Sequence, residues 1–315
     1  MSERARIDLL RARLGAAPAH VRLGIGDDCA VLEAGDGALV WTVDAAVEGV
    51  HFARAWLDPM DIGWRATAAA ISDLAAMGAE PLGVLAALVL PDDVDDTALA
   101  AIADGQRGAA EDAGTAVIGG NLARGRELSI TTTALGRAID PLPRDGARAG
   151  DAVWLAGDVG LAAAGLALLS GDHRGSSAAA TAARRAFARP HPRIAEGIAA
   201  RAHGRAAIDI SDGLATDLAQ LASASGVRVV LDATALVTGE LDAVARELGR
   251  DALELALFGG EDYALVVVAP ARARLEGFHL IGACEPRTPG ESAVGLCARD
   301  GKVSDLPDRG WDHFR

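Results

Sequence analysis

Short strings in which aspartate stands beside glycine or at the end of an apolar run recur along the whole chain. They place Asp27 and Asp28 in GIGDDCAVL, Asp44 in TVDAAVEGVHF, Asp73 in SDLAAMGAEP, and Asp209 and Asp212 in AIDISDGLATDL. Carboxylates in such strings suit hard cations better than a solvated face, because Mg²⁺ takes oxygen ligands and is commonly shared with substrate phosphates. The strings therefore predict a metal-dependent phosphate site.

The composition limits the class of protein. The chain has 315 residues, half of them apolar and only 3% aromatic, so we expect two domains with cores of small aliphatic side chains. A formal net charge of −14 argues against a nucleic-acid partner, which needs a basic surface. No run of 18 apolar residues is present, so no membrane partner is expected. The three cysteines lack CxxC spacing, which fits the reducing cytoplasm.

Lysine is almost absent. Lys302 is the only lysine, and it stands in a polar DGKVSD turn. A Walker loop needs a lysine in a glycine-rich turn, and a protein kinase needs one on its third strand. Both classes are therefore excluded, and a bound triphosphate would have to be neutralised by cations and arginines.

Apolar runs and turn residues predict the elements of the N-terminal half. We expect strands over residues 29–33 and 38–43 with a hairpin-type turn at Asp36-Gly37, and a long helix that begins at Pro59 and stops at Gly78. Further strands are expected over residues 82–90, 116–118 and 128–138, with a helix to about Gly114 after the first of them.

A segment rich in Pro, Gly and Arg, residues 140–150, is the expected domain boundary, which gives domains of residues 1–140 and 141–315. Beyond it we expect a strand at VWLAG, a helix at LAAAGLALL, a strand-turn-helix at AAIDISDGLATDLAQLA, and strands near 227–231 and 264–268. These alternations favour an α/β or α+β fold.

Taken singly, each acidic string also has a structural explanation. Asp212 could cap the following helix, and Asp73 could be a solvent-facing residue of its helix. Asp27 and Asp28 are adjacent and point to opposite sides of an extended segment, so we expect only Asp28 to be a ligand. Converging carboxylates would repel by about 4 kcal/mol for a pair about 4 Å apart at an effective dielectric constant of about 20, so a shared site requires cations.

The strings, in this order, resemble those of the thiamine-monophosphate kinase family. The matching strings are GIGDDCAVL, VEGVHF, SDLAAMGAEP, IGGN, RDGARAGD, DISDGL, FGGEDY and GWDHF, which span residues 24 to 314. The resemblance implies a PurM-like two-domain fold. Its N-terminal domain, a mixed sheet with helices, would bind ATP and Mg²⁺ and form a homodimer through the sheet, and a C-terminal α/β layer domain would carry DISDG and GGEDY. The ATP site is implied to lie between the domains or across the dimer.

The resemblance also implies a reaction, the transfer of the γ-phosphoryl group of ATP to thiamine monophosphate to give thiamine diphosphate. The acceptor phosphate is already anionic at neutral pH, so no general base is needed. Catalysis then rests on positioning and charge neutralisation. In an acidic chain with one lysine, that neutralisation is expected to come from several Mg²⁺ ions and an arginine.

Site residues follow from the matching strings alone. The resemblance implies metal ligation by Asp28, Thr42, Val43, Asp44, Asp73, Asn121, Asp209 and Asp212. It implies ATP contacts from Gly120, Asn121, Arg144 and Ser211, thiamine monophosphate contacts from His51, Glu261 and Trp311, and catalytic roles for Asp28, Asp44, Asp73, Asp212 and Arg144. Outside the family pattern, the default explanations are a half-buried histidine for His51, a solvated linker charge for Arg144 and a buried anchor of the tail for Trp311.

The chain departs from the family pattern at several positions. Asn121 and Leu122 stand where the family has aspartate and usually threonine, Val43 where it commonly has a hydroxyl residue, and Ala45 where it usually has threonine. An amide oxygen at residue 121 or a backbone carbonyl at residue 43 can still ligate Mg²⁺, but neither brings a charge. We therefore expect fewer or more loosely bound Mg²⁺ ions than the family norm.

These departures leave a second hypothesis open, a catalytically weakened homologue that binds nucleotide or thiamine phosphate without turnover. Two other enzymes of the superfamily are disfavoured. Selenophosphate synthetase would require a reactive cysteine or selenocysteine with a lysine near the N-terminus, and the hydrogenase maturation factor would end in a cysteine tail, whereas this chain ends in WDHFR.

Overall fold

The computed structural model describes residues 3–23, 31–32, 35–171, 175–307 and 309. The chain divides into two compact units. Unit 1 comprises Met1–Leu74 and Ala79–Asp140, and unit 2 comprises Ala75–Gly78 and Pro141–Arg315. Each unit has its own sheet, and the fold is mixed α/β, as the alternation of apolar runs predicts.

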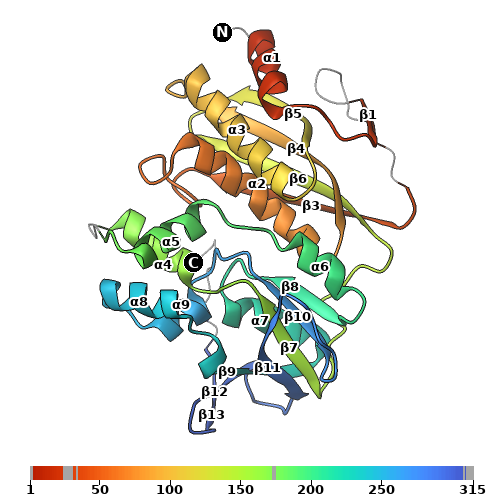
Figure 1. The fold of residues 1–315 in the computed structure, drawn as a ribbon, viewed down its shortest axis with the longest axis vertical. Helices are drawn as coiled ribbons and strands as arrows, with labels where there is room; N and C mark the ends of the chain where they lie inside the picture. Colours follow the sequence, from red (N-terminus) through yellow and green to blue (C-terminus); the bar gives the residue numbers. More distant parts are fainter. Residues whose placement is uncertain (1–2, 24–30, 33–34, 172–174, 308, 310–315) are drawn as a thin grey trace. The chain divides into compact units, whose positions relative to one another are not determined.

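Unit 1 is built on a four-stranded sheet in the order β3-β6-β4-β5 (Figure 1). The strands are β3 (Ala38–Val47), β4 (Glu80–Leu90), β5 (Val117–Arg124) and β6 (Ser129–Ala138). The pair β4–β5 is parallel, and β6 runs antiparallel to both β3 and β4. Strand β5 is longer than the expected 116–118, so Gly120 and Asn121 lie within it.

Helices cover one face of this sheet. They are α2 (Pro59–Ala76) and α3 (Asp96–Asp112), and α1 (Glu3–Leu14) packs on α3 (Figure 1). Every second residue of β6 is buried beneath them, including Ile130 and Ala134. The backbones of α2 and α3 approach closely, because a Cβ on Gly105 would lie 1.9 Å from the carbonyl oxygen of Met60.

The other face of β3 is exposed and apolar. Leu39, Trp41 and Val43 are 56%, 74% and 63% exposed. The indole N–H of Trp41 donates a hydrogen bond of 2.6 Å to the hydroxyl of Thr133 on β6, which fixes the ring against the sheet. An exposed apolar patch of this kind often marks a surface that binds another molecule.

The hairpin expected at Asp36-Gly37 is wrong. Strand β2 (Val31–Leu32) pairs with β1 (Val21–Leu23) in a separate two-stranded sheet, whereas β3 pairs with β6. A tight hairpin needs a loop of about two residues, and Leu32 and Ala38 are separated by five.

Unit 2 contains a seven-stranded mixed sheet in the order β13-β12-β9-β11-β7-β10-β8 (Figure 1). Its strands are β7 (Asp151–Ala156), β8 (Ala206–Asp209), β9 (Val227–Asp232), β10 (Leu265–Pro270), β11 (His279–Pro286), β12 (Val294–Cys297) and β13 (Val303–Asp305). Among the described strands of this sheet, β9 and β12 are the only pair that runs in parallel. The sequence-based expectations located β7 to β10 but omitted the last three strands.

Both faces of the unit 2 sheet are covered, which is why β7 and β8 are buried at every position. Leu155, Ile208 and Val266 face a core built with α4 (Leu161–Ser170), α5 (Ala178–Ala188), α7 (Leu214–Ser225), α8 (Gly239–Leu248) and α9 (Ala252–Phe258). Trp154 and Val267 face a second core, which includes Ala200 of α6 (Ile194–Ala200). A strand that is buried on both faces has a continuous apolar sequence, as VWLAG does.

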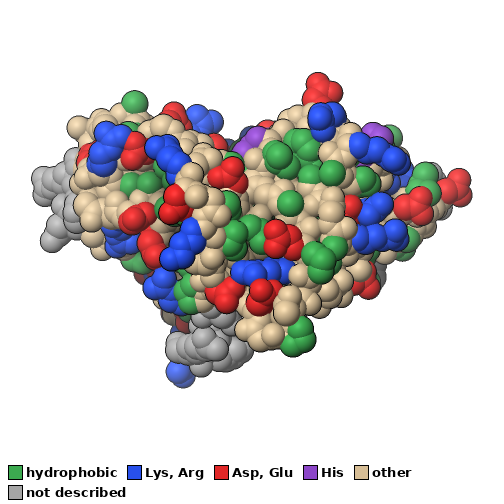
Figure 2. Space-filling view, turned by 90° about the horizontal axis from the view of Figure 1, so that it is seen from below, with side chains coloured by type: hydrophobic (Ala, Val, Ile, Leu, Met, Phe, Trp, Pro, Cys, Tyr) green, Lys and Arg blue, Asp and Glu red, His purple; other side chains and the backbone are tan. Residues whose placement is uncertain are grey.

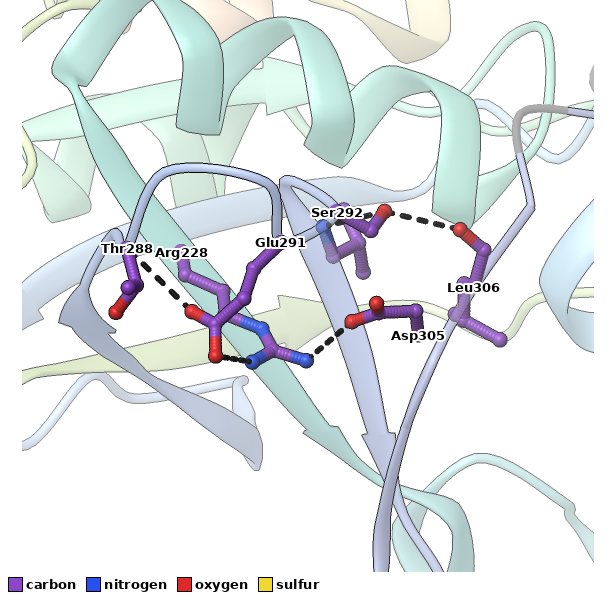
Figure 3. A network of polar contacts seen from close by, with 7 residues as sticks. Arg228, Thr288, Glu291, Ser292, Asp305 and Leu306 are labelled. Carbon is purple, nitrogen blue, oxygen red and sulfur yellow. Dashed lines mark hydrogen bonds and ion pairs between the residues drawn. The ribbon is translucent and has the colours of Figure 1, made fainter.

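An ion-pair network fastens the edge strands β12 and β13 (Figure 3). The buried Arg228 of β9 contacts Glu291 at 3.2 Å and Asp305 at 2.6 Å. Glu291 also accepts a hydrogen bond from the backbone N–H of Thr288, and the Ser292 hydroxyl donates to the carbonyl of Leu306. Arg228 therefore has a structural role.

Two surface properties bear on partners. On the face drawn in Figure 2, basic and acidic side chains are interspersed, so neither sign of charge dominates there. Among the described helices, none combines the length and apolar character that crossing a bilayer requires.

Candidate functional site

In unit 1, a threonine and an aspartate from two elements meet. The hydroxyl of Thr42 on β3 donates a hydrogen bond to the Asp73 carboxylate on α2. Thr42 and Asp44 are two residues apart on one strand, so they share the face of the sheet that α2 covers. All three side chains are half-buried. Unit 1 thus brings together three residues that the sequence strings implicate in metal binding.

An unsatisfied hydroxyl lies beside this group. Thr132 on β6 is the cross-strand partner of Asp44, is fully buried, and its hydroxyl has no hydrogen-bond partner among the described residues. A buried polar atom of this kind calls for an explanation such as an unseen ion or water. The oxygen-only set of Thr42, Asp44, Asp73 and Thr132 is chemically suited to Mg²⁺.

Asn121 is placed apart from this group. Cross-strand pairing places Asp44, Thr132, Ala86 and Gly120 in one row across the sheet. Asn121 follows Gly120 on β5, so it belongs to the next row and its side chain points to the opposite face of the sheet. Strands β3 and β5 are the two edges of the sheet. At about 4.8 Å per strand, Asp44 and Asn121 are therefore about 14 Å apart in one copy of the chain. The register does not let both residues bind one ion within one subunit.

His51 lies in the turn that follows β3. The Nδ1 atom of its ring accepts a hydrogen bond of 3.1 Å from the backbone N–H of Val47. The backbone N–H of His51 donates to the carbonyl of Val47 at 3.0 Å. Because Nδ1 is an acceptor, the neutral ring carries its proton on Nε2. The turn therefore fixes both the orientation and the tautomer of His51.

In unit 2, the DISDG string forms the turn from β8 into α7. Asp209 ends β8 and is buried. One oxygen of the Asp217 carboxylate, in the first turn of α7, accepts hydrogen bonds from the backbone N–H groups of Ser211, Asp212 and Gly213 at 3.0, 3.1 and 3.2 Å. The N-cap Gly213 has no side chain to satisfy these donors, so Asp217 does so from within the helix.

The neighbouring carboxylates perturb Asp217. Burial raises its pKa to about 8, and repulsion from Asp212 and Asp209 acts in the same direction, whereas the backbone N–H donors favour the ionised form. The backbone N–H of Asp212 is bonded to Asp217, and Asp209 ends the strand that leads into the same turn. A cation bound by Asp209 and Asp212 would relieve this repulsion.

The GGEDY string packs against the DISDG turn. The N–H groups of Glu261 and Tyr263 donate to the carbonyls of Ser211 and Ile210 at 2.7 and 2.8 Å. A Cβ on Gly260 would lie 2.6 Å from the Ser211 carbonyl oxygen, so only glycine permits this approach. Glu261 and Tyr263 have positive φ angles of 63° and 49°. Positive φ in non-glycine residues is costly and concentrates at functional sites.

The hydrogen bonds of Asp262 account for the positive φ angles of the residues on either side of it. Its carboxylate accepts hydrogen bonds from Gly160 N–H at 2.7 Å and Ala162 N–H at 3.1 Å, at the N-terminus of α4. Burial raises the pKa of Asp262 to about 7, the two N–H donors lower it, and Glu261 and Asp158 raise it. Asp262 is thus anchored at the N-terminus of α4, and the side chain of Glu261 is half-buried. The Tyr263 hydroxyl donates a hydrogen bond of 3.0 Å to the Glu261 carboxylate.

Arg144 lies on the surface of unit 2 beside α7. Its guanidinium donates to the Gln220 side chain at 3.1 Å, and its carbonyl accepts from the Ser225 hydroxyl at 2.8 Å. Gln220 is six residues beyond the start of α7, about 9 Å along the axis. In this conformation, Arg144 is held along the helix rather than at its N-terminus.

Two of the implicated residues, Asp28 and Trp311, lie outside the described residues. Within the described ranges, no three His, Cys, Asp or Glu side chains form a ready-made metal site. Mg²⁺ is usually held by one or two carboxylates and completed by water and substrate phosphates.

Three residues of these two groups were not identified from the sequence. They are Thr132, Asp217 and Asp262. A signal existed for Asp217, since an aspartate in the first turn of a helix that begins with glycine has free N–H groups within reach. Thr132 and Asp262 gave no local signal, because their contacts depend on strand register and on the position of α4.

Family models match both halves of the chain. Residues 26–138 match the AIR synthase related protein, N-terminal domain, and residues 148–283 match the AIR synthase related protein, C-terminal domain. Thiamine-monophosphate kinase of Mycobacterium tuberculosis is 38% identical over 307 residues, which cover 94% of this chain and 90% of the relative.

Two solved structures are similar over nearly the whole chain. Thiamine-monophosphate kinase from Stenotrophomonas maltophilia K279a has a TM-score of 0.83 at 35% identity, covering 96% of this chain and 98% of that one. AaThiL complexed with AMPPCP and TMP has a TM-score of 0.81 at 32% identity, covering 99% and 97%.

Proposed function

Because the chain belongs to the thiamine-monophosphate kinase family, we propose that it transfers the γ-phosphoryl group of ATP to thiamine monophosphate. The observation that carries this proposal is the likeness to AaThiL complexed with AMPPCP and TMP, which extends over 99% of this chain. Both ligands are held by one protein of the same fold. The product of the transfer is thiamine diphosphate.

The chemistry asks little of the protein beyond positioning. An oxygen of the thiamine monophosphate phosphate attacks the γ-phosphorus of ATP, the bond to the β-phosphate oxygen breaks, and ADP leaves. The attacking oxygen is already ionised at neutral pH, so no side chain has to remove a proton. Alignment of the two phosphates and neutralisation of their charge then account for the rate.

Carboxylates in each unit fit Mg²⁺ as the neutralising ion. In unit 1, Thr42, Asp44 and Asp73 would hold it, with the buried hydroxyl of Thr132 beside them. In unit 2, Asp209 and Asp212 would do so. When bound, Mg²⁺ would draw off charge from the phosphate oxygens and hold them in line. The backbone carbonyl of Val43 and the side chain of Asp28, which lies outside the described residues, stay proposed ligands on the family pattern alone.

Contacts to the substrates are also proposed on the family pattern. Glu261 is presented by a strained backbone and bonded to Tyr263, which supports a fixed position for its carboxylate. It would pair with the thiazolium charge or the aminopyrimidine ring, and His51 and Trp311 are proposed as further contacts to thiamine monophosphate. Gly120, Ser211 and Arg144 would contact ATP. Arg144 would have to leave Gln220 in order to grip phosphate.

We propose in addition that two copies associate through the uncovered face of the unit 1 sheet. The exposed Leu39, Trp41 and Val43 support this face as an interface. Asn121 belongs to the same face. It lies about 14 Å from Asp44 in one copy and on the opposite face of the sheet, so its proposed metal contact would involve a different ion from the one that Asp44 would hold.

A direct assay tests the function. Purified protein is incubated with ATP, thiamine monophosphate and Mg²⁺, and thiamine diphosphate and ADP are quantified by chromatography. The proposal predicts equal amounts of both products. If ATP and thiamine monophosphate bind but neither product accumulates, the chain is instead the weakened homologue that Asn121 and Val43 suggest.

A further inference from the structure

One carboxylate of unit 2 accepts three backbone hydrogen bonds, and the proposed mechanism gives it no task. A single oxygen of Asp217 accepts from three consecutive N–H groups, those of Ser211, Asp212 and Gly213, at 3.0 to 3.2 Å. Asp217 is 2% exposed. Consecutive N–H groups that converge in this way form an anion-binding nest, here strengthened by the N-terminus of the 12-residue helix α7.

In many phosphate-binding proteins, a nest at a helix N-terminus binds the phosphate itself. Here the chain's own carboxylate fills it, so the nest cannot bind an ATP or thiamine phosphate oxygen. The negative groups of Asp209 and Asp212 stand on the same turn. The turn is therefore built to present carboxylates to a cation, not N–H groups to an anion.

The opposite side of the turn is fixed as well. The carbonyls of Ile210 and Ser211 accept from Tyr263 and Glu261, and Asp262 between them is bonded to the N-terminus of α4. The GGEDY string thus holds the carbonyl side of the turn, while Asp217 holds the N–H side. Removal of Asp217 would free three donors at one edge and leave the other edge fixed.

We propose that Asp217 is a positioning residue, which holds the backbone of residues 211–213 so that Asp209 and Asp212 bind a divalent cation. The proposal rests on the proposed function only for the metal-binding role of those two aspartates. Asp217 itself touches neither cation nor substrate in this account, because its Oδ2 accepts the three backbone donors and the side chain is buried.

The test compares three variants. Asp217→Ala removes all three hydrogen bonds. Asp217→Asn keeps an amide oxygen that can take the place of the single accepting oxygen, so the turn stays in place. Asp151→Ala is the control for stability, because Asp151 is also a buried carboxylate of unit 2. It is bonded to Arg205 and to the Arg148 N–H, neither of which belongs to the site.

Two measurements are made on each protein without turnover. Hydrogen exchange follows the amides of residues 211–213. Electron paramagnetic resonance measures Mn²⁺ binding in the presence of AMPPCP. For Asp217→Ala we expect at least about tenfold faster exchange and at least about tenfold weaker Mn²⁺ binding, a cost of about 1.4 kcal/mol. Asp217→Asn should stay within about threefold of wild type in both. Asp151→Ala should melt at lower temperature with both quantities within about twofold.

Three results would overturn the proposal. The first is an Mn²⁺ affinity of Asp217→Ala within twofold of wild type. The second is a loss of Mn²⁺ affinity in Asp151→Ala as large as that in Asp217→Ala. The third is a wild-type protein that binds no Mn²⁺. If Asp217→Ala does not fold, Asp217→Glu, which displaces the carboxylate by one methylene, takes its place with the same outcomes. A wild type that binds Mn²⁺ but forms no thiamine diphosphate would refute the proposed function and leave this proposal standing.

Discussion

The hydroxyl of Thr42 donates a hydrogen bond to the carboxylate of Asp73, although the two residues are 31 positions apart and belong to a strand and a helix. This bond joins β3 to α2 on the covered face of the unit 1 sheet. It brings two of the acidic strings of the sequence into contact. The first prediction concerns this contact.

Asp73→Asn should lower turnover by on the order of 100-fold, the loss typical of removing one electrostatic group from a preorganised site. The amide can still accept the Thr42 hydrogen bond, so the melting temperature should change little. Steady-state assays of thiamine diphosphate formation measure the effect. Asp61→Asn, the same charge change in the first turn of the same helix, is the control and should retain wild-type turnover.

Asn121→Asp should reduce the Mg²⁺ concentration needed for half-maximal turnover by on the order of fivefold, because a charge is added at a position implied to bind metal. Ala123→Asp adds the same charge two residues along the same face of β5 and should have no such effect. An unchanged Mg²⁺ requirement in Asn121→Asp would remove Asn121 from the set of ligands.

Trp41→Glu should convert a dimer into a monomer, because it places a charge at the centre of the exposed apolar face. Size-exclusion chromatography with light scattering measures the mass. Leu280→Glu changes a side chain in unit 2 that is 53% exposed, and it should leave the mass unchanged. A wild-type protein that is monomeric at micromolar concentration would refute the interface.

Asp262 should make unit 2 less stable as the pH rises. Its pKa is about 7 in the folded protein and 3.8 for the free side chain, so its contribution is fully present below about pH 4 and is lost as the pH rises through 7. Between pH 5 and 8, the free energy of unfolding should fall by on the order of 2–4 kcal/mol more in wild type than in Asp262→Asn.

Urea unfolding at several pH values checks the Asp262 prediction. Asp251→Asn is the control, since Asp251 also accepts two N–H groups at a helix N-terminus but is exposed. Its pH profile should follow that of wild type. Parallel profiles for wild type and Asp262→Asn would mean that the Asp262 carboxylate is ionised throughout this range.

Local signals in the sequence located most of the elements. Pro59 and Gly78 bound α2 as expected, because proline fits the first helical position and glycine tolerates the left-handed conformation after the last turn. The continuous apolar run VWLAG identified β7, because a strand buried on both faces carries apolar residues at successive positions. The turn at Asp36-Gly37 was misassigned as a hairpin, because pairing partners are chosen by the whole sheet and not by the turn alone.

The site was harder to derive from the sequence. The acidic strings indicated a cation site, and the resemblance to the family implied Asp44, Asp73, Asp209 and Asp212 as its ligands, but not which of them meet. The separation of Asn121 from Asp44 follows from a strand order that no local signal encodes. Asp217 escaped notice because an aspartate near a helix start has an ordinary capping explanation, and only its three hydrogen bonds to the DISDG turn distinguish it.

The central claim is that acidic side chains of this protein bind a triphosphate only through divalent cations. Calorimetric titration of wild-type protein with AMPPCP, with Mg²⁺ and again with EDTA, tests it most directly. The account predicts binding in Mg²⁺ and at least about a hundredfold weaker binding in EDTA, because a chain of net charge −14 with one lysine would repel the bare nucleotide. Equal affinity in the two titrations would contradict it.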